Sequence, residues 1–393
     1  MHVDIHALQT VPYSNLNRDA IGSPKSCVYG GRTRTRVSSQ SWKRAVRKIV
    51  EQELGETTLR TRRVAEAVAK TLRKRDWSDE DARKAGRAVM FAANSRAKRS
   101  DAKEGGIAPD PATDMSGVLF WIPTAAIAEL ADLCERHRDA IAATALPELD
   151  EKGKPKKTKE KADIVVPAAA VDEILALRSP TINLLGRMLA EIPGHGVDGA
   201  TLFAHAFTTH ETAMDLDFFT AVDDLPNGET GAGHLATAEF TSGVFYRYSS
   251  INIGHLARNM GGSVDEALTI TDAYLRAFTT AIPGGKQNVT AATTRPDLVY
   301  LALRRDPLSL AAAFEKPVLP ARDGGHAEPS RKRLNDYAGQ LERFLGTGPL
   351  WSGYASVDTA EYTHLGTPAE SLDTLIVNAT TAASDQPIPV GAV

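Results

Sequence analysis

Residues 28–50, VYGGRTRTRVSSQSWKRAVRKIV, decide the fold because two structural patterns meet in them. Residues 28–37 alternate Arg with Thr, which is typical of a β-strand or an extended arm. The residues that follow repeat apolar side chains with helical spacing, and Ser38 or Ser39 can cap that helix. The stretch therefore predicts a strand or arm that leads directly into an amphipathic helix.

The same region is strongly basic. Residues 25–50 contain no Asp or Glu and eight cations: Lys25, Arg32, Arg34, Arg36, Lys43, Arg44, Arg47 and Lys48. The whole chain of 393 residues has 46 basic and 49 acidic residues, and its net charge is −3. Subtracting the eight positive charges of this segment leaves −11 for the rest of the chain. A basic patch on an acidic body is typical of a specific binding site for a polyanion.

Outward from this stretch, strand and helix patterns alternate. Residues 3–11 alternate as a strand, and residues 297–304 form an apolar strand. Two β-rich flanks within residues 205–250 can pair as a long hairpin, and residues 263–282 open with a capping box and continue as a helix. The order β, α, β-hairpin, α, β predicts an α+β, ferredoxin-like fold. The RNA-recognition module, whose sheet face binds single strands, has the same plan.

Residues 56–200 differ from their surroundings because their patterns are helical throughout. Within them, residues 148–163 are dense in charge and poor in apolar side chains, so we expect a mobile, solvated loop. The sequence predicts a helical insertion between two parts of one domain, residues 1–55 and 201–350. Residues 351–393 follow as a C-terminal tail.

The remaining composition excludes several classes of protein. Cys27 and Cys134 lie far apart in the sequence, which argues for a reducing cytoplasm and against a disulfide framework. The first residues have neither the basic nor the apolar region of a signal peptide. The most apolar run, residues 118–130, is interrupted by Pro123 and is too short to span a bilayer. We expect a soluble, cytoplasmic protein.

Candidate catalytic groups are few, and no metal or cofactor is expected. His205 and His210 are five residues apart with no Cys nearby, which does not favour a zinc site. The hairpin acids lie among turn signals, where Asp commonly makes local hydrogen bonds: Asp215, Asp217, Asp223 and Asp224. Asp19 lies in a loop beside the basic stretch, so a metal-dependent endoribonuclease that uses Asp19 is an alternative function. A single acid without a visible base is weak support for that reading.

Several motifs occur in a fixed order along the chain: LNRD (16–19), GGRTRTRVSSQSWKRAVR (30–47), HAFTTH (205–210), DFFTAVDDL (217–225), EFTSGVFYRYSSIN (239–252) and PGGKQ (283–287). Together they resemble the hexameric, CasC-type backbone subunit of the type I-E CRISPR effector complex, Cascade. The matches run to about residue 320, and the end of the chain matches poorly.

This resemblance implies a molecule shaped like a hand. The ferredoxin-like core is the palm, the helical insertion is the fingers, and the long β-hairpin is the thumb. In the family, several copies stack head to tail along the spacer part of a CRISPR RNA, together with other Cascade subunits. The palm grips the RNA backbone, and each thumb displaces one nucleotide, so that the guide is presented to target DNA. The family's members in type I complexes bind rather than cut.

The candidate RNA-backbone contacts surround the basic stretch and the PGGKQ turn. Arg offers a planar fork that matches phosphate, Ser and Gln add neutral donors, and the helix N-terminus adds oriented N–H groups. The predicted contacts are Arg18, Lys25, Arg32, Arg34, Arg36, Ser38, Gln40, Lys43, Arg44, Arg47 and Lys286. A solvated cationic face and a generic single-stranded RNA-binding protein remain the alternatives from the residues alone.

Apolar side chains supply the other candidates. The resemblance implies that Phe218 and Phe219 displace the nucleotide, although both could instead anchor the hairpin in a hydrophobic cluster. Met188 matches a family position near the same kink, although a lone Met is usually part of a core. Residues 243–248, GVFYRY, alternate aromatic side chains around Arg247, for which ordinary strand packing is the alternative to RNA binding.

Overall fold

The computed structural model of the chain describes residues 1–96, 106–147, 164–189, 191–221 and 234–390. It divides into two compact units. The first comprises Met1–Val50 and Ala200–Val393, and the second comprises Glu51–Gly199. Residues 148–163, for which the sequence predicts a mobile loop, lie outside the described residues. None of the described helices is long and apolar enough to cross a membrane.

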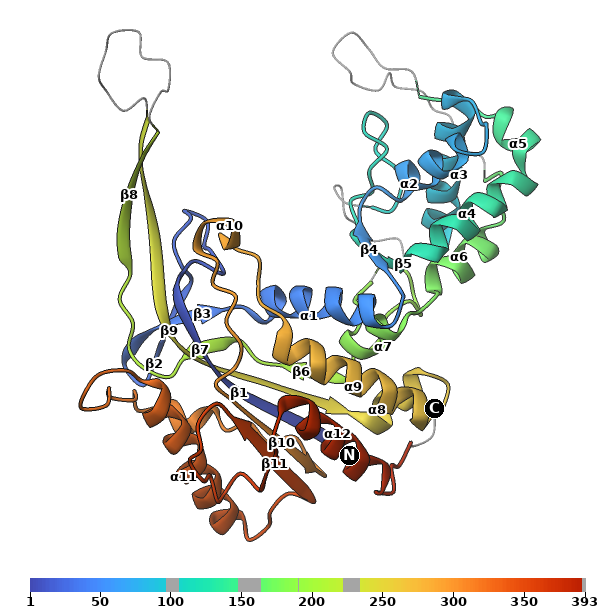
Figure 1. The fold of residues 1–393 in the computed structure, drawn as a ribbon. Helices are drawn as coiled ribbons and strands as arrows, with labels where there is room; N and C mark the ends of the chain where they lie inside the picture. The colour runs from blue at the N-terminus through green and yellow to red at the C-terminus, as the bar shows by residue number, and fades with distance from the viewer. Residues whose placement is uncertain (97–105, 148–163, 190, 222–233, 391–393) are drawn as a thin grey trace, which may run out of the picture. The chain divides into compact units, whose positions relative to one another are not determined.

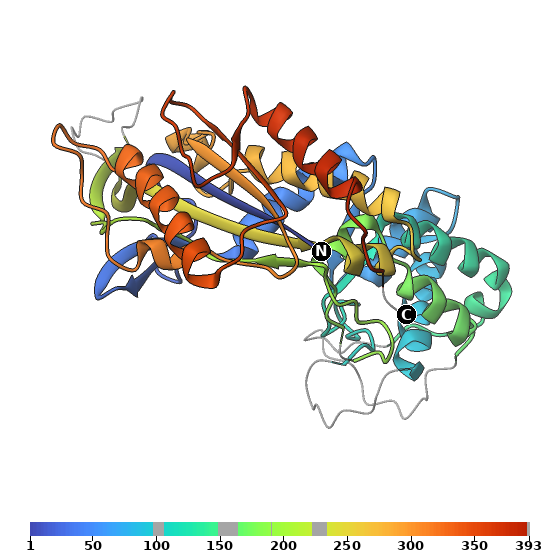
Figure 2. The same ribbon diagram turned by 90° about the horizontal axis from the view of Figure 1, so that it is seen from below.

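The first unit is built on a ten-stranded sheet of the described residues, in the order β12-β11-β10-β1-β9-β7-β3-β2, with β6 and β8 also paired to β9 (Figures 1 and 2). At its centre β1 (His2–Ser14) lies antiparallel between β9 (His234–Asn252) and β10 (Leu298–Arg304). The other strands are β2 (Ser26–Tyr29), β3 (Arg32–Val37), β6 (Thr201–Phe203), β7 (Ala206–Thr208), β8 (Asp215–Ala221), β11 (Trp351–Ser356) and β12 (Thr367–Pro368).

The helices of this unit complete the predicted topology. They are α1 (Ser39–Glu53), α8 (Ile253–Asn259), α9 (Val264–Thr280), α10 (Gln287–Thr290), the 3-10 turn η1 (Ala311–Phe314), α11 (Ala327–Leu345) and α12 (Leu372–Ser384). The path β1, α1, β7 with β9, α9, β10 is the split βαβ arrangement. The prediction of an α+β, ferredoxin-like palm is therefore confirmed. At the start of α9, the Ser263 hydroxyl accepts from the Glu266 amide, as the capping box predicts.

Both faces of the central sheet are covered (Figure 1). On one face Tyr246 and Tyr248 pack beneath η1 and α11, in a core that includes Phe314. On the other face Phe245 packs with Trp42 of α1. Ordinary strand packing, the alternative for residues 243–248, is therefore correct for both faces. A sheet-face RNA site of the kind used by RNA-recognition modules is not available on these strands.

The face beneath α1 and α9 encloses a cation. The guanidinium of Arg247 lies 3.7 Å from the ring centroid of Trp42 and 4.2 Å from that of Phe278. It donates to the Gln9 side-chain oxygen at 2.7 Å and to the Phe278 carbonyl at 2.6 Å. Burial lowers the pKa of Arg247 to about 9, so the group remains charged at neutral pH. Cation–π contacts and two carbonyl acceptors offset part of the cost of burying this charge.

The C-terminal segment, expected only as a tail, extends the sheet. β11 pairs antiparallel with β10, and β12 lies parallel to β11. Helix α12 is capped by Ser371, whose hydroxyl accepts from the Thr374 amide, and it buries Leu375 and Ile376. Arg276 of α9 makes an ion pair with Asp373. These contacts attach residues that match the family motifs poorly to the edge of the palm.

The second unit is mainly helical, as the sequence predicts. Its elements are β4 (Thr58–Thr61), α2 (Val64–Arg73), α3 (Asp79–Arg96), β5 (Phe120–Pro123), α4 (Thr124–Arg136), α5 (Arg138–Ala142), α6 (Ala168–Ala176) and α7 (Pro180–Leu185). Helices α2 and α3 approach closely at Gly86, where a Cβ atom would lie 2.2 Å from the Ala65 carbonyl oxygen. Only glycine permits this approach.

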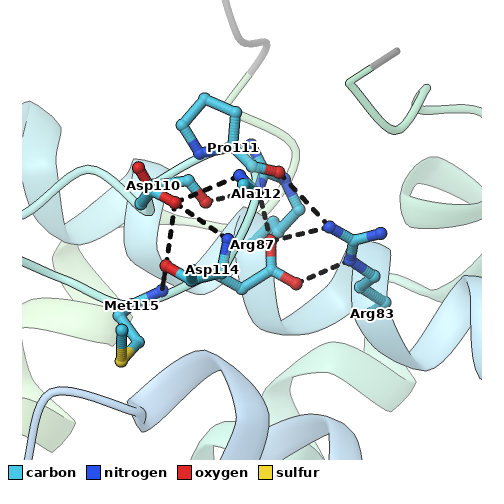
Figure 3. Close-up of polar contacts among 8 residues, drawn as sticks. Arg83, Arg87, Asp110, Pro111, Ala112, Asp114 and Met115 are labelled. Carbon is cyan, nitrogen blue, oxygen red and sulfur yellow. Dashed lines mark hydrogen bonds and ion pairs between the residues drawn. The ribbon is translucent and has the colours of Figure 1, made fainter. Parts of the chain in front are cut away.

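A polar network fixes the turn after α3 (Figure 3). The Asp114 carboxylate accepts from the guanidinium groups of Arg83 and Arg87. Each arginine also donates to the turn backbone, at the Pro111 and Asp110 carbonyls respectively. Hydrogen bonds from the Thr113 hydroxyl and amide lower the pKa of Asp110. Because charge-assisted bonds at both arginines converge on one turn, we expect this turn to be rigid.

Candidate nucleic-acid interface

The LNRD loop is tied to the start of α1 by Asn17. Its side-chain oxygen accepts from the Ser38 amide at 2.8 Å, and its carbonyl accepts from the Lys25 amide at 2.9 Å. The Arg36 amide in turn donates to the Lys25 carbonyl at 2.8 Å. These bonds bring Arg18, Lys25, Arg36 and Ser38 to one end of α1, although they come from a loop, a strand and a helix cap.

The PGGKQ turn meets the same loop from another side. A Cβ atom on Gly285 would lie 2.4 Å from the Leu16 carbonyl oxygen, so the two backbones require glycine for their close approach. Gln287 closes the turn by donating to the Pro283 and Ala292 carbonyls. Half-buried Lys286 follows Gly285 with a φ of 55°. This arrangement places Lys286 beside the LNRD loop.

The first turn of α1 lies at this cluster, and two of its backbone amides are hydrogen-bonded by the side chains of His205 and Ser38. The Ser39 amide donates to Nδ1 of His205 at 2.8 Å, and the Ser38 hydroxyl accepts from the Ser41 amide. Burial, then the nearby charges of Arg36 and Lys25, lower the pKa of His205. A neutral imidazole thus accepts from the helix start. Of the two caps that the sequence allows, Ser38 and Ser39, the structure has Ser38.

The cations of the cluster are open to an anion. Arg18, Gln40 and Arg44 are exposed, whereas Lys25, Arg36 and Lys43 are half-buried. In the part of the chain that the structure describes, no carboxylate forms an ion pair with Lys25, Arg36, Lys43 or Arg44. Burial lowers the pKa of Lys43, with no acid to offset it. Half-buried cations without an acidic partner gain energy when a phosphate approaches.

Two predicted contacts are engaged elsewhere. Arg34 is fully buried, and its guanidinium donates to the carbonyls of Thr208, Phe314 and Glu315. The prediction of Arg34 as an RNA contact is wrong, because β3 turns this side chain into the palm. Arg32 forms an exposed ion pair with Glu211 at 3.6 Å, a contact of little energetic weight. Arg47 is half-buried farther along α1.

Asp19 organises its own loop. One carboxylate oxygen accepts from the amides of Ile21 and Ser23, both at 3.0 Å, and the Asp19 amide donates to the Ser23 carbonyl. Asp commonly closes turns in this way. Among the residues described by the structure, no group of three His, Cys, Asp or Glu side chains could hold a metal ion. The geometry gives Asp19 a structural role beside the cation cluster.

The predicted thumb is a two-stranded ribbon of β8 and β9 that extends from the sheet (Figure 1). Phe218 is 66% exposed and Phe219 is 46% exposed, so neither is buried in a cluster that anchors the hairpin. Adjacent strand residues point to opposite faces, so the two rings serve different sides of the ribbon. Phe219 shares its face with Phe240, which stacks on Tyr13 at the base of the ribbon. Asp223 and Asp224 lie outside the described residues.

Met188 belongs to the second unit and is 93% exposed. Its neighbours Arg187 and Leu189 are buried, and Arg187 forms an isolated β-bridge with Val197. The alternative that Met188 is part of a core is therefore wrong. An exposed thioether on a bridged backbone can meet the face of a flat ligand.

A family model described as CT1975-like protein matches residues 3–378 of the chain. The chain belongs to this family.

The CT1975-like chain is also similar to chains of solved structures. One is from a "CRISPR RNA-guided surveillance complex, pre-nicking", with 42% identity, a TM-score of 0.84, and an alignment that covers 98% of this chain and 100% of that chain. Another, from a "CRISPR RNA-guided surveillance complex", has 36% identity, a TM-score of 0.76, and coverage of 97% and 100%. No curated protein matches. The similarity extends over both units and the C-terminal segment.

In this CT1975-like protein, the sequence did not predict two residues that organise the candidate interface at the start of α1, nor one residue that holds the second unit together. Asn17 lies in the LNRD motif directly before Arg18, and this position in a loop is the one sequence feature that could have pointed to it. The sequence pattern raises His205 only as an unfavoured zinc ligand, whereas its ring accepts from the Ser39 amide at the start of α1. Arg187 precedes Met188 and is 3% exposed. Nothing in a single sequence distinguishes such a buried arginine from the exposed ones.

Proposed function

We propose that this CT1975-like protein is the CRISPR RNA-binding backbone subunit of a type I-E Cascade complex. Copies of the chain stack head to tail along the spacer RNA, grip its backbone, and displace nucleotides at intervals to present the guide to target DNA. The protein works in the cytoplasm with other Cascade subunits and carries out no chemistry of its own. The observation that supports this proposal most directly is the set of cations at the start of α1 that form no ion pair with a described carboxylate.

The geometry suits a phosphodiester backbone more than a particular base sequence. Arg36 and Arg44 present guanidinium forks, Lys43 presents a point charge, and Ser38 and Gln40 lie at the positive end of the helix. Contacts of this kind position a strand without reading its bases. The family and the similarity to chains of CRISPR surveillance complexes favour this role over a generic single-strand binder.

The salt dependence of RNA affinity tests this proposal. For single strands, log K falls by about 0.7 per log unit of salt for each phosphate that is neutralised. We expect the double variant Lys43→Ala/Arg44→Ala to bind a guide-length RNA more weakly and to flatten the slope by about 1.4. Fluorescence anisotropy titrations at several salt concentrations measure both quantities.

A matched control removes the same two charges from another helix. Lys332 and Arg343 lie exposed on α11, which packs on the opposite face of the sheet from α1. Lys332→Ala/Arg343→Ala is expected to keep the wild-type slope. If both double variants flatten the slope equally, the effect is one of net charge, and the interface does not lie at α1.

We further propose that Asp19 does not catalyse RNA cleavage, since its carboxylate is engaged by two backbone amides. Labelled RNA incubated with the purified protein and Mg²⁺ is expected to remain intact on a denaturing gel. Cleavage that disappears in Asp19→Asn would instead establish the endoribonuclease alternative. An Asp215→Asn variant, changed at an exposed acid of β8, serves as the control.

A further inference from the structure

The side chain of Arg187 holds together separate segments of the second unit. Its guanidinium donates to five main-chain carbonyls, those of Trp121, Leu175, Ala176, Leu177 and His195, at 2.9–3.3 Å. These carbonyls belong to β5, to the C-terminal end of α6, and to the segment that returns to Arg187. Burial, followed by the charge of Arg178, lowers the pKa of Arg187 to about 10, so the side chain stays charged at neutral pH. A planar fork can satisfy this many acceptors, whereas a lysine ammonium cannot.

The backbone on either side of Arg187 is closed at a narrow neck. The amides and carbonyls of Arg187 and Val197 exchange two hydrogen bonds of 2.8 Å. At the neck, a Cβ atom on Gly199 would lie 2.6 Å from the Gly186 nitrogen, so both strands need glycine. His195 adds a hydrogen bond from its ring to the Asp172 carboxylate of α6 at 2.9 Å. The described residues of this segment are thus attached to the helical unit at several points.

This attachment fixes the direction of Met188. Because neighbouring residues of a β-bridge point to opposite sides, an inward Arg187 places Met188 outward, where it is 93% exposed. Around it the surface is hollowed, lined by the apolar residues Leu185, Leu189 and Val197, by glycines, and by the charged residues Arg187 and Asp198. An exposed Met side chain is flexible and reorients at little energetic cost. Here the hydrogen bonds between Arg187 and Val197 fix the backbone that carries it.

We propose that Arg187 is a positioning residue, which presents Met188 as a preset wedge against the face of a nucleobase in the bound RNA. This inference rests on the proposed function and on the resemblance that places Met188 near the displaced nucleotide. It deepens that function by naming Arg187 as the group that fixes Met188. Preorganisation matters here because ordering the Met188 segment on binding would cost conformational entropy and so weaken its contact with the base. Met188 touches the base, and Arg187 acts through Met188.

The test separates base unstacking from backbone binding. Full-length protein is mixed with guide-length RNAs, each carrying at one position a fluorescent adenine analogue whose emission rises when it unstacks. We expect Met188→Ala and Arg187→Lys to lose most of the increase at the displaced positions. Both variants should leave the salt slope of RNA binding unchanged, because the phosphate contacts are elsewhere. The double variant should lose no more than either single one.

Two further variants control for damage to the fold. Arg87→Lys alters another buried arginine of the same unit, the one paired with Asp114 in Figure 3, and is expected to keep the full fluorescence increase. Gly199→Ala widens the neck while Arg187 is retained, and it is expected to reproduce the loss even if Arg187→Lys does not fold. A folded Arg187→Lys or Gly199→Ala protein with full unstacking would overturn the inference, as would full unstacking in Met188→Ala. Failure of the wild-type protein to bind RNA would instead reject the proposed function itself.

Discussion

Replacing Arg247 with Ala is expected to lower the free energy of unfolding of the first unit by about 3–5 kcal/mol. The substitution leaves the Gln9 side-chain oxygen and the Phe278 carbonyl without their donor, in a site that is 1% exposed. It also opens a cavity between the rings of Trp42 and Phe278. Hydrogen exchange of β1 and β9 amides in increasing urea measures the effect within the unit concerned.

The companion variant Arg247→Lys distinguishes charge from shape. Lysine keeps the positive charge but cannot lie flat between two rings while donating to both acceptors. We expect it to lose nearly as much stability as the Ala variant. A loss below about 1 kcal/mol in Arg247→Ala would mean that the buried charge costs as much as its contacts contribute.

The pH dependence of the palm's stability is expected to depend on Asp4 and His6, which lie on one face of β1 and whose pKa values shift in opposite directions. Burial, followed by the charge of Arg304, lowers the pKa of His6 to about 3. A lowered folded-state pKa means that stability is present above pH 6.5 and is lost as pH falls toward 3, by roughly 5 kcal/mol in total. Burial raises the pKa of Asp4 to about 6, so its contribution of roughly 3 kcal/mol is present below pH 3.8 and lost as pH rises through 6.

Between pH 6 and pH 4 these contributions change in opposite directions, each by about 1.4 kcal/mol per pH unit. We expect Asp4→Asn to lose stability steeply on acidification. His6→Phe, which keeps an aromatic ring near Tyr248 and Tyr300, should be much flatter or should gain stability. The other histidines whose pKa values are lowered, His2, His195, His205, His210 and His326, are present in both variants. Parallel pH profiles of the two variants from denaturant titrations would contradict this account.

Much of the palm could be predicted from sequence because its signals are local. Alternation along residues 3–11 and 243–248, together with helical spacing after Ser38, specifies the order of strands and helices. The C-terminal strands could not be predicted in the same way. β11 is only Trp351–Ser356, and its place beside β10 depends on pairing across a long stretch of sequence. Short strands take their structure from neighbours more than from intrinsic preference.

The candidate site was predictable in composition but not in detail. Alternation puts Arg32, Arg34 and Arg36 on one side of a strand, yet it cannot tell that the carbonyls of Thr208 and Phe314 bind Arg34. It also implies, once the strand is known, that Phe218 and Phe219 face opposite sides. The role of Arg187 depends on five carbonyls that only the folded chain brings together, so no spacing of residues in the sequence predicts it.

Helices cover both faces of the palm's central strands, so the aromatic side chains of those strands are buried and cannot stack on RNA bases. Under the proposed function, the charged groups at the start of α1 would meet the sugar–phosphate chain that is common to every RNA sequence. Under the proposed function, a protein that binds RNA in this way would accept a new guide sequence without any change in its own residues.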